Sequence, residues 1–152
     1  MSSFYIETPF DNYLIFQIDK KINEIFFAPK REGLRLSGDL RKIALSVFEQ
    51  RNFSFFDYSL LNVDRLSEKQ LRLHSFLIST KCGETYYYSE VAERVFGSKR
   101  YSRGVARLLS VNRFAFFVPC HRVLAKNGLG GYSAYQGVKL KKKILQWEGA
   151  KI

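Results

Sequence analysis

The chain has 152 residues, of which 46% are hydrophobic and 16% aromatic, enough for a packed core, so a disordered chain is excluded. Its formal net charge is +11 at pH 7, and residues 1–87 hold 12 Lys and Arg against 11 Asp and Glu, whereas residues 88–152 hold 13 against 3. No run of 18 apolar residues predicts a membrane span, and the N-terminus lacks the basic and apolar regions of a signal peptide, so we expect a cytosolic protein without membrane association.

The first 66 residues are predicted to form a small α/β unit. Two β-rich runs, residues 13–19 and 22–27, are joined by a short charged turn and are typical of a hairpin. Residues 39–51 place apolar side chains at helical spacing, which predicts an amphipathic helix that covers one face of the sheet. The segment contains neither Cys nor His, so it offers no thiol or imidazole ligand for zinc.

A connector is expected between Asp57 and Asp64. After it, Ser67-Glu-Lys-Gln70 has the form of a capping box ahead of another apolar stripe, which predicts the start of a helix. We therefore expect a domain boundary near residue 66, with an N-terminal α/β domain over residues 1–66 and a second domain over residues 67–152.

Two short helices separated by a short turn are predicted next. Residues 89–96 and residues 102–111 each carry apolar side chains on one face, and Gly97 ends the first helix. Two such helices are typical of a helix-turn-helix that docks on DNA. The excess of basic residues in this half predicts a face that binds a polyanion in a salt-dependent way.

Three residues of the second predicted helix are candidates for DNA contact. Arg103 and Arg107 stand four residues apart, away from the apolar stripe, and Gly104 leaves room for a groove to approach the backbone. The alternative is a solvated pair of arginines on an ordinary surface helix.

The segment Pro119-Cys-His-Arg122 follows an apolar run, residues 114–118, which predicts a buried strand. A thiol with an ordinary pKa of about 8.5 is only partly ionised at neutral pH, and an adjacent imidazole can take its proton. Cys120 is therefore a candidate nucleophile and His121 its base, with a buried structural cysteine as the alternative. The chain has only two Cys and two His, so we expect free thiols and no metal site.

Glu148 falls at helical spacing with Leu140, Ile144 and Trp147, so its carboxylate is expected to point inward. A carboxylate on an apolar face is costly without a partner. The expected partner is His121 or a basic side chain, and a salt bridge to one of the lysines at positions 141–143 is the alternative.

Several segments of the second half together resemble one protein family. They are Ser102-Arg-Gly-Val-Ala106, Asn112, Val118-Pro-Cys-His-Arg-Val123, Gly130-Gly-Tyr-Ser133 and Trp147-Glu-Gly149. Their order and spacing are similar to those of the O6-alkylguanine-DNA alkyltransferases, from about Gly83 to the C-terminus. The resemblance implies an α/β protein, with a small N-terminal sheet-plus-helix domain of RNase H-like type before a mainly helical, winged-helix-like DNA-binding domain.

The resemblance also implies a reaction. The protein would turn O6-alkylguanine out of double-stranded DNA and move the alkyl group irreversibly onto Cys120, once per molecule, as a monomer and without a cofactor. Base flipping is required because a protein thiol cannot reach the edge of a stacked base. Glu148 would orient His121 and complete a relay from Cys120 through a water, and the lysines at 141–143 would then stay solvated.

The resemblance further assigns the residues around the base. Tyr88 would protonate guanine N3, although Tyr86 and Tyr87 are rival candidates by composition. Asn112 would tie the turn between the recognition helix and the nucleophile. In the loop, Ser133 would donate to guanine O6 and Tyr132 would wall the base. The carbonyls of Cys120 and Val123 would accept from the exocyclic amine.

On the DNA side, the resemblance implies a helix bound in the minor groove, with Arg103 inserted where the nucleotide is turned out. This chain has Arg-Gly-Val-Ala where relatives usually have Arg-Ala-Val-Gly, and Arg107 replaces a small residue, so it is expected to reach a phosphate. A non-catalytic module that recognises alkylated DNA is the alternative from another class, disfavoured by Cys120 beside His121. A cysteine hydrolase would turn over without DNA.

Overall fold

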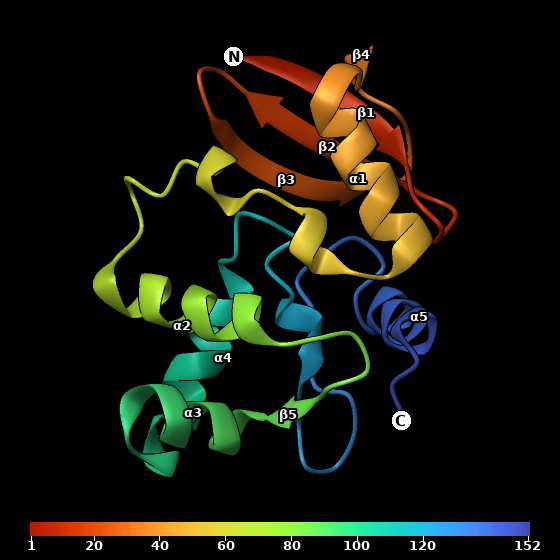
Figure 1. Ribbon diagram of the computed structural model, residues 1–152. Coiled ribbons are helices and arrows are strands. Elements are labelled where there is room, and N and C mark those ends of the chain that lie inside the picture. The colour runs from red at the N-terminus through yellow and green to blue at the C-terminus, as the bar shows by residue number, and fades with distance from the viewer.

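The structure, a computed structural model, describes residues 1–152 and begins with a four-stranded sheet (Figure 1). The strands are β1 (Ser2–Glu7), β2 (Tyr13–Ile18), β3 (Ile22–Ala28) and β4 (Leu34–Arg35), in the order β3-β2-β1-β4. The predicted hairpin is confirmed as the antiparallel pair β2-β3. β1 pairs antiparallel with β2 and parallel with β4. Neither β1 nor β4 was predicted from the sequence.

Helix α1 (Gly38–Gln50) crosses one face of this sheet, as the apolar spacing predicted (Figure 1). Ala44, Val47 and Phe48 are buried on the side that carries the apolar stripe. The helix ends where Arg51 adopts a left-handed conformation with φ of 51°.

Two single-turn 3-10 helices, η1 (Phe53–Phe55) and η2 (Tyr58–Leu60), lead from α1 to α2 (Glu68–Ser79). The capping box at the start of α2 is confirmed. The backbone N–H of Gln70 donates to Ser67 Oγ at 3.2 Å, and the N–H of Ser67 donates to Gln70 Oε1 at 2.8 Å. These contacts satisfy N–H groups that a helix start otherwise leaves unpaired.

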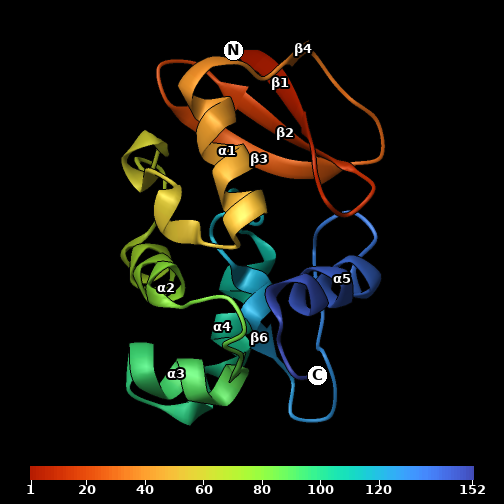
Figure 2. The same ribbon diagram turned by 45° about the vertical axis from the view of Figure 1, so that its right-hand side comes forward.

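The rest of the chain is mainly helical, and α3 (Tyr88–Phe96) lies at the end of the molecule opposite the sheet (Figure 2). The predicted helix-turn-helix is confirmed, with Gly97 in a left-handed conformation after the first helix, α3. The elements are β5 (Tyr86–Tyr87), α3 (Tyr88–Phe96), η3 (Lys99–Tyr101), α4 (Ser102–Ser110), η4 (Cys120–Arg122), β6 (Val123–Leu124) and α5 (Val138–Glu148). β5 and β6 pair in parallel.

Residues 114–118 form a turn, so the expectation of a buried strand before the cysteine is wrong. The N–H groups of Phe117 and Val118 donate back to the carbonyls of Ala115 and Phe114 at 2.9 and 3.0 Å. Phe116 has φ of 71°, in the left-handed region. Phe116 and Phe117 are both fully buried, so the turn places two consecutive rings in the core.

A single hydrophobic cluster of 30 buried residues runs through both halves of the molecule. Near its centre the Phe116 ring packs against Phe53 and Trp147, with ring centroids 4.8 and 5.8 Å apart. The turn is also paired with the edge of the sheet, because Ile25 donates to the Arg113 carbonyl at 2.8 Å and accepts from Ala115 at 3.0 Å. The domain boundary near residue 66 stays a prediction.

The fold class is α/β, with a mixed sheet and a helix followed by a helical second half. None of the helices combines the length and the apolar character that crossing a membrane requires.

Candidate active site

Cys120 begins η4 and is only 7% exposed. Asn112 holds the turn that delivers it, because its Nδ2 donates to the Val118 carbonyl at 3.0 Å and to Cys120 Sγ at 3.3 Å. The Oδ1 atom of the same side chain accepts from the backbone N–H of Phe114 at 3.0 Å. One amide therefore fixes both ends of the turn and the thiol itself. The family resemblance had implied that Asn112 ties this turn.

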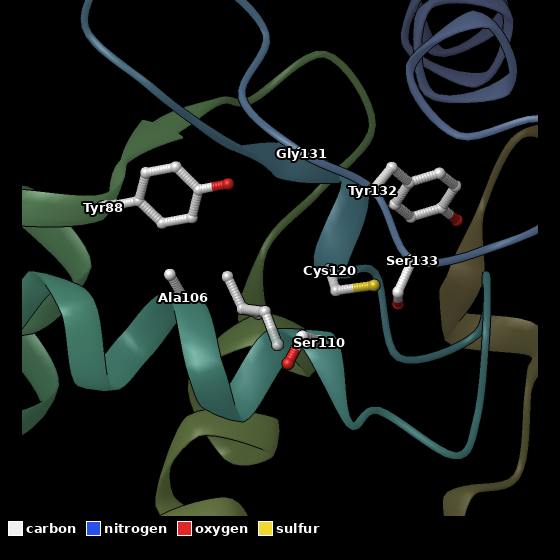
Figure 3. A pocket seen from close by; sticks show the side chains of 8 residues that line it. Tyr88, Ala106, Ser110, Cys120, Gly131, Tyr132 and Ser133 are labelled. Atoms are coloured by element: carbon white, nitrogen blue, oxygen red, sulfur yellow. The ribbon is translucent and has the colours of Figure 1, made fainter.

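A cavity of about 360 Å³ opens beside the thiol (Figure 3). Its walls come from the start of α3, from α4, from η4 and from the loop before α5. The lining residues are Tyr88, Ala106, Leu109, Ser110, Cys120, Gly131, Tyr132 and Ser133. The structure thus brings four of the predicted site residues, Tyr88, Cys120, Tyr132 and Ser133, to one cavity.

Of the three neighbouring tyrosines, only Tyr88 lines the cavity. Tyr86 packs against Phe76, with ring centroids 5.2 Å apart, and Tyr87 is 41% exposed. Gly130 lets the loop approach Tyr88 closely. It has φ of 74°, and a Cβ atom there would lie 2.7 Å from the Tyr88 hydroxyl, so a larger residue would strain the backbone and displace Tyr88.

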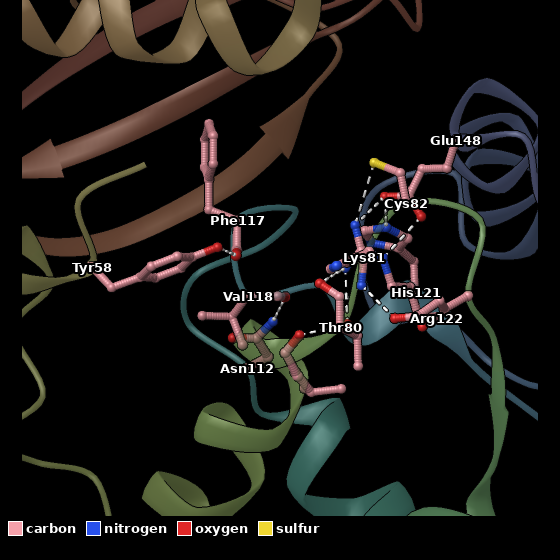
Figure 4. A network of polar contacts seen from close by, with 12 residues as sticks. Tyr58, Thr80, Lys81, Cys82, Asn112, Phe117, Val118, His121, Arg122 and Glu148 are labelled. Carbon is pink, nitrogen blue, oxygen red and sulfur yellow. Dashed lines mark hydrogen bonds and ion pairs between the residues drawn. The ribbon is translucent and has the colours of Figure 1, made fainter. Parts of the chain in front are cut away.

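The two residues that follow Cys120, His121 and Arg122, form a buried polar network with Glu148 (Figure 4). The Nε2 atom of His121 lies 2.9 Å from Glu148 Oε2, and Glu148 points inward as expected. Arg122 donates from Nε to Glu148 Oε1 at 2.9 Å and from Nη2 to Oε2 at 2.7 Å. The alternative of a lysine partner for Glu148 is wrong, because Arg122 is the cation that holds it.

Arg122 is fully buried and ties several elements together. Its Nη1 donates to the carbonyl and to the hydroxyl of Thr80, both at 2.9 Å, and its guanidinium lies 4.7 Å from the centre of the Phe53 ring. No role was predicted for this arginine from the sequence. A basic residue directly after His121 in a segment of buried residues was the available signal.

Lys141 is 1% exposed, so the expectation that all three lysines at 141–143 stay solvated is wrong for this one. Its Nζ donates to the carbonyl of Val123 at 2.7 Å and to that of Gly131 at 3.0 Å. Lys141 stands three, four and seven residues before Ile144, Leu145 and Glu148, which places it on the buried stripe of α5. That spacing was readable in the sequence.

The protonation states follow from burial. Burial raises the pKa of the Cys120 thiol, although the hydrogen bond from Asn112 and the charge of Lys141 oppose the rise. Burial lowers the pKa of His121. For Glu148, burial alone would raise the pKa, but the contacts with His121 and Arg122 outweigh it and hold the pKa at about 2. At neutral pH the site holds a thiol, a neutral imidazole and a carboxylate.

The second half of the chain, residues 68–150, matches the protein family described as 6-O-methylguanine DNA methyltransferase, DNA binding domain. The match covers more than half of the chain. The chain belongs to this family.

Curated relatives carry the corresponding name. The methylated-DNA--protein-cysteine methyltransferase of Methanothermobacter thermautotrophicus is 43% identical over 98 residues, which is 64% of this chain and 53% of the relative. That of Metallosphaera sedula is 46% identical over 83 residues, or 55% of this chain and 50% of the relative. The chain therefore spans about half the length of the curated relatives that it matches.

Solved structures match the fold over nearly the whole chain. The O6-methylguanine-DNA methyltransferase of Pyrococcus kodakaraensis strain KOD1 superposes with a TM-score of 0.78 at 20% identity, over 98% of this chain and 99% of that chain. The Mycobacterium tuberculosis OGT crystallised in complex with DNA gives a TM-score of 0.75 at 23% identity, over 97% of this chain and 92% of that chain. The methyltransferase fold thus includes the N-terminal sheet.

The predicted DNA-contact residues lie apart from the cavity in this methyltransferase-family chain. Arg103 and Arg107 are exposed on α4 and do not line the cavity. The space beside Gly104 is filled, because a Cβ atom there would lie 2.4 Å from the ring of Tyr101. Gly104 therefore makes room for an aromatic ring of the same chain, and its approach to a DNA groove stays a prediction.

The two backbone carbonyls expected to accept from the base, those of Cys120 and Val123, already accept hydrogen bonds within the protein. Val123 O accepts from Lys141, and Cys120 O accepts from the N–H of Val123. Each carbonyl has a second lone pair, so one acceptor site remains on each. No group of three or more His, Cys, Asp or Glu side chains is arranged to hold a metal ion.

Proposed function

We propose that this protein restores guanine in double-stranded DNA by moving the alkyl group of O6-alkylguanine onto Sγ of Cys120. The observation that carries the proposal is the buried thiol at a cavity also lined by Tyr88 and Ser133. Family membership supports it, and so does the DNA bound to the Mycobacterium tuberculosis relative.

The reaction is a single displacement. Sγ forms a bond to the alkyl carbon, the bond from that carbon to O6 breaks, and its electron pair passes to the guanine ring. Glu148 is ionised, so neutral His121 donates Nε2–H to it and keeps a lone pair on Nδ1, which has no protein partner. We propose that Nδ1 takes the thiol proton through a water, which counters the effect of burial on Cys120.

Guanine leaves more easily as a neutral molecule than as an anion, so a proton donor at N3 lowers the barrier. Tyr88 is the candidate donor, because it lines the cavity beside Cys120 and its hydroxyl, whose pKa burial raises, carries its proton at neutral pH. Ser133 would donate to O6, Tyr132 would wall the base, and Cys120 and Val123 would accept from the exocyclic amine at their free lone pairs. His121 gains the proton that the thiol loses, and guanine gains the proton that Tyr88 loses. The number of protons in the site and the base is therefore unchanged.

We also propose that α4 lies along the minor groove, with Arg103 entering the stack and Arg107 on a phosphate. Flipping needs such an insertion because it fills the space that the extruded base leaves. The thioether formed has no route back, so each molecule would act once, as a monomer and without a cofactor. We also propose a cytosolic location, where a reducing environment would keep both cysteines as free thiols.

The test is the intact mass of the protein after incubation with a duplex that contains O6-methylguanine. One methyl group per molecule is expected, on Cys120, and Cys120→Ser should lose transfer but keep DNA binding. Cys82→Ser is the matched control and should react like the wild type. A methyl group on Cys82, or more than one guanine repaired per molecule, would contradict the proposal.

A further inference from the structure

Helix α4, which carries Arg103, begins without the features that stabilise most helix starts. Tyr101 is the N-cap residue, and no side chain caps the first turn. The Ser102 hydroxyl donates instead to the carbonyl of Lys99 at 2.5 Å. The first turn has no acidic residue, whereas Lys99, Arg100 and Arg103 bring positive charge to the end of a helix that favours negative charge. Another contact must therefore hold this turn in place.

The ring of Tyr101 supplies such a contact. It packs against Phe96 of α3, with ring centroids 4.7 Å apart, and the ammonium of Lys69 on α2 lies 4.8 Å from its centre. On α4 itself the ring covers Gly104, where a Cβ atom would overlap three carbons at the hydroxyl end of the ring. One side chain thus joins the first turn of α4 to α2 and α3, and these three helices pack together (Figure 1).

Gly104 lies inside a helix, where glycine is ordinarily unfavourable. Its backbone is not in the left-handed region, so the conformation of the chain does not require a glycine there. Glycine in a helix interior is less stable than alanine because it loses more conformational freedom on folding. The space that the Tyr101 ring occupies is the feature of the structure that explains glycine at this position. Tyr101 and Gly104 therefore form a coupled pair.

We propose that Tyr101 is a positioning residue for Arg103, and that it acts by packing its ring on Gly104. The inference rests on the proposed function, in which Arg103 enters the DNA stack. Arg103 follows Tyr101 by two residues, so an ordered first turn fixes the direction in which its side chain leaves α4. An arginine on a frayed turn would lose conformational freedom at the moment of insertion, which would make the flipped state less stable. Reaction with a free base involves no insertion and does not depend on the pair.

The test is a double-mutant cycle on Tyr101→Ala and Gly104→Ala. For each protein, the single-turnover rate on a duplex with O6-methylguanine is divided by the rate with free O6-benzylguanine. Gly104→Ala should lower this ratio at least about threefold when Tyr101 is present, because the new Cβ displaces the ring, and should not lower it in the Tyr101→Ala background. An ordinary helix glycine would give a different result, since alanine then strengthens the helix in both backgrounds.

Tyr101→Phe, which keeps the ring and removes the hydroxyl, should retain the wild-type ratio. The rate with the free base shows whether each variant keeps a folded site. An unchanged or raised ratio in Gly104→Ala, an equal loss in both backgrounds, or a loss in Tyr101→Phe as large as in Tyr101→Ala would overturn the inference and leave the proposed function standing. A wild type that transfers no alkyl group to Cys120 from either substrate would overturn both.

Discussion

Arg122 and Glu148 form a bidentate ion pair in which both side chains are fully buried. The same carboxylate also holds His121 at 2.9 Å. Arg122 therefore fixes the charge and the orientation of the group that positions the candidate base. The pair connects the stability of the protein to the geometry of its site.

Replacing Arg122 by alanine should lower the free energy of unfolding by about 3–5 kcal/mol, because the variant leaves the Glu148 carboxylate buried without its cation. Urea denaturation measures the change. Glu7→Gln breaks the exposed ion pair with Arg35 and should cost less than about 1 kcal/mol. Similar losses in both variants would show that the buried pair contributes no more than a surface pair.

Tyr88→Phe should slow alkyl transfer by about 10²-fold or more while DNA binding is kept, because the variant removes the proton donor and retains the ring. Single-turnover rates on methylated duplex measure the effect, with binding followed separately by fluorescence anisotropy. Tyr87→Phe is the matched control, since Tyr87 is exposed and does not line the cavity beside Cys120. An unchanged rate in Tyr88→Phe would remove the hydroxyl from the mechanism.

Arg103→Ala should slow repair in duplex DNA at least about tenfold more than reaction with free O6-benzylguanine, because extruding a base costs a few kcal/mol and the free base needs no extrusion. Arg100→Ala, at an exposed position before α4, controls for lost positive charge. If Arg103→Ala slows both reactions equally, the arginine supports the protein rather than the flipped state.

Lys141→Met should shift the pH dependence of alkyl transfer to higher pH. The ammonium of Lys141 lowers the pKa of Cys120, so its loss raises the pH at which the thiolate forms. Burial lowers the pKa of Lys141 itself to about 8, so in the wild type this help fades as the pH rises through that value. Lys142→Met changes an exposed lysine and should leave the profile in place. Coincident profiles for Lys141→Met and wild type would refute the charge effect.

His74 should make the protein less stable in acid. Burial lowers its pKa from 6.5 to about 4, so between these values the unfolded chain binds a proton that the folded chain does not. The titration of His74 leaves the free energy of unfolding unchanged above pH 6.5. As the pH falls from 6.5 to 4 it lowers that free energy, by at most roughly 3 kcal/mol. His74→Phe, which keeps an aromatic ring beside Phe114, should flatten this part of the curve. Urea melts across the range measure it, and parallel curves for both proteins would contradict the assignment.

The spacing of apolar residues predicted the helices that bury one face. The stripe of α1, the Ser67 capping box and the two helices on either side of Gly97 all stand where their patterns placed them. Each of these signals depends on side chains within about one helical turn of each other, so a single sequence contains it. Glu148 was predicted to point inward on the same ground.

The errors share a different cause. The turn at Phe116 exists because consecutive aromatic rings pack into a core built from both halves of the chain. Lys141 is buried because two carbonyls from β6 and the loop converge on its ammonium. Arg122 donates hydrogen bonds to Thr80 and Glu148, which lie in distant segments of the chain. The spacing on α5 did place Lys141 on the buried stripe, but the partners of Lys141 and Arg122 lie in distant segments and leave no mark in local spacing.

The pairing of β3 with other segments leaves little of that strand edge free. Ile22 bonds to Asn62, and Ile25 bonds to Arg113 and Ala115. On the opposite edge, β4 is only two residues long and carries Arg35. Exposed strand edges are templates for aggregation, and natural sheets cover, shorten or charge them. A molecule whose nucleophile turn is displaced from β3 would uncover one of these edges, so the turn that delivers the thiol also covers backbone groups through which another strand could pair.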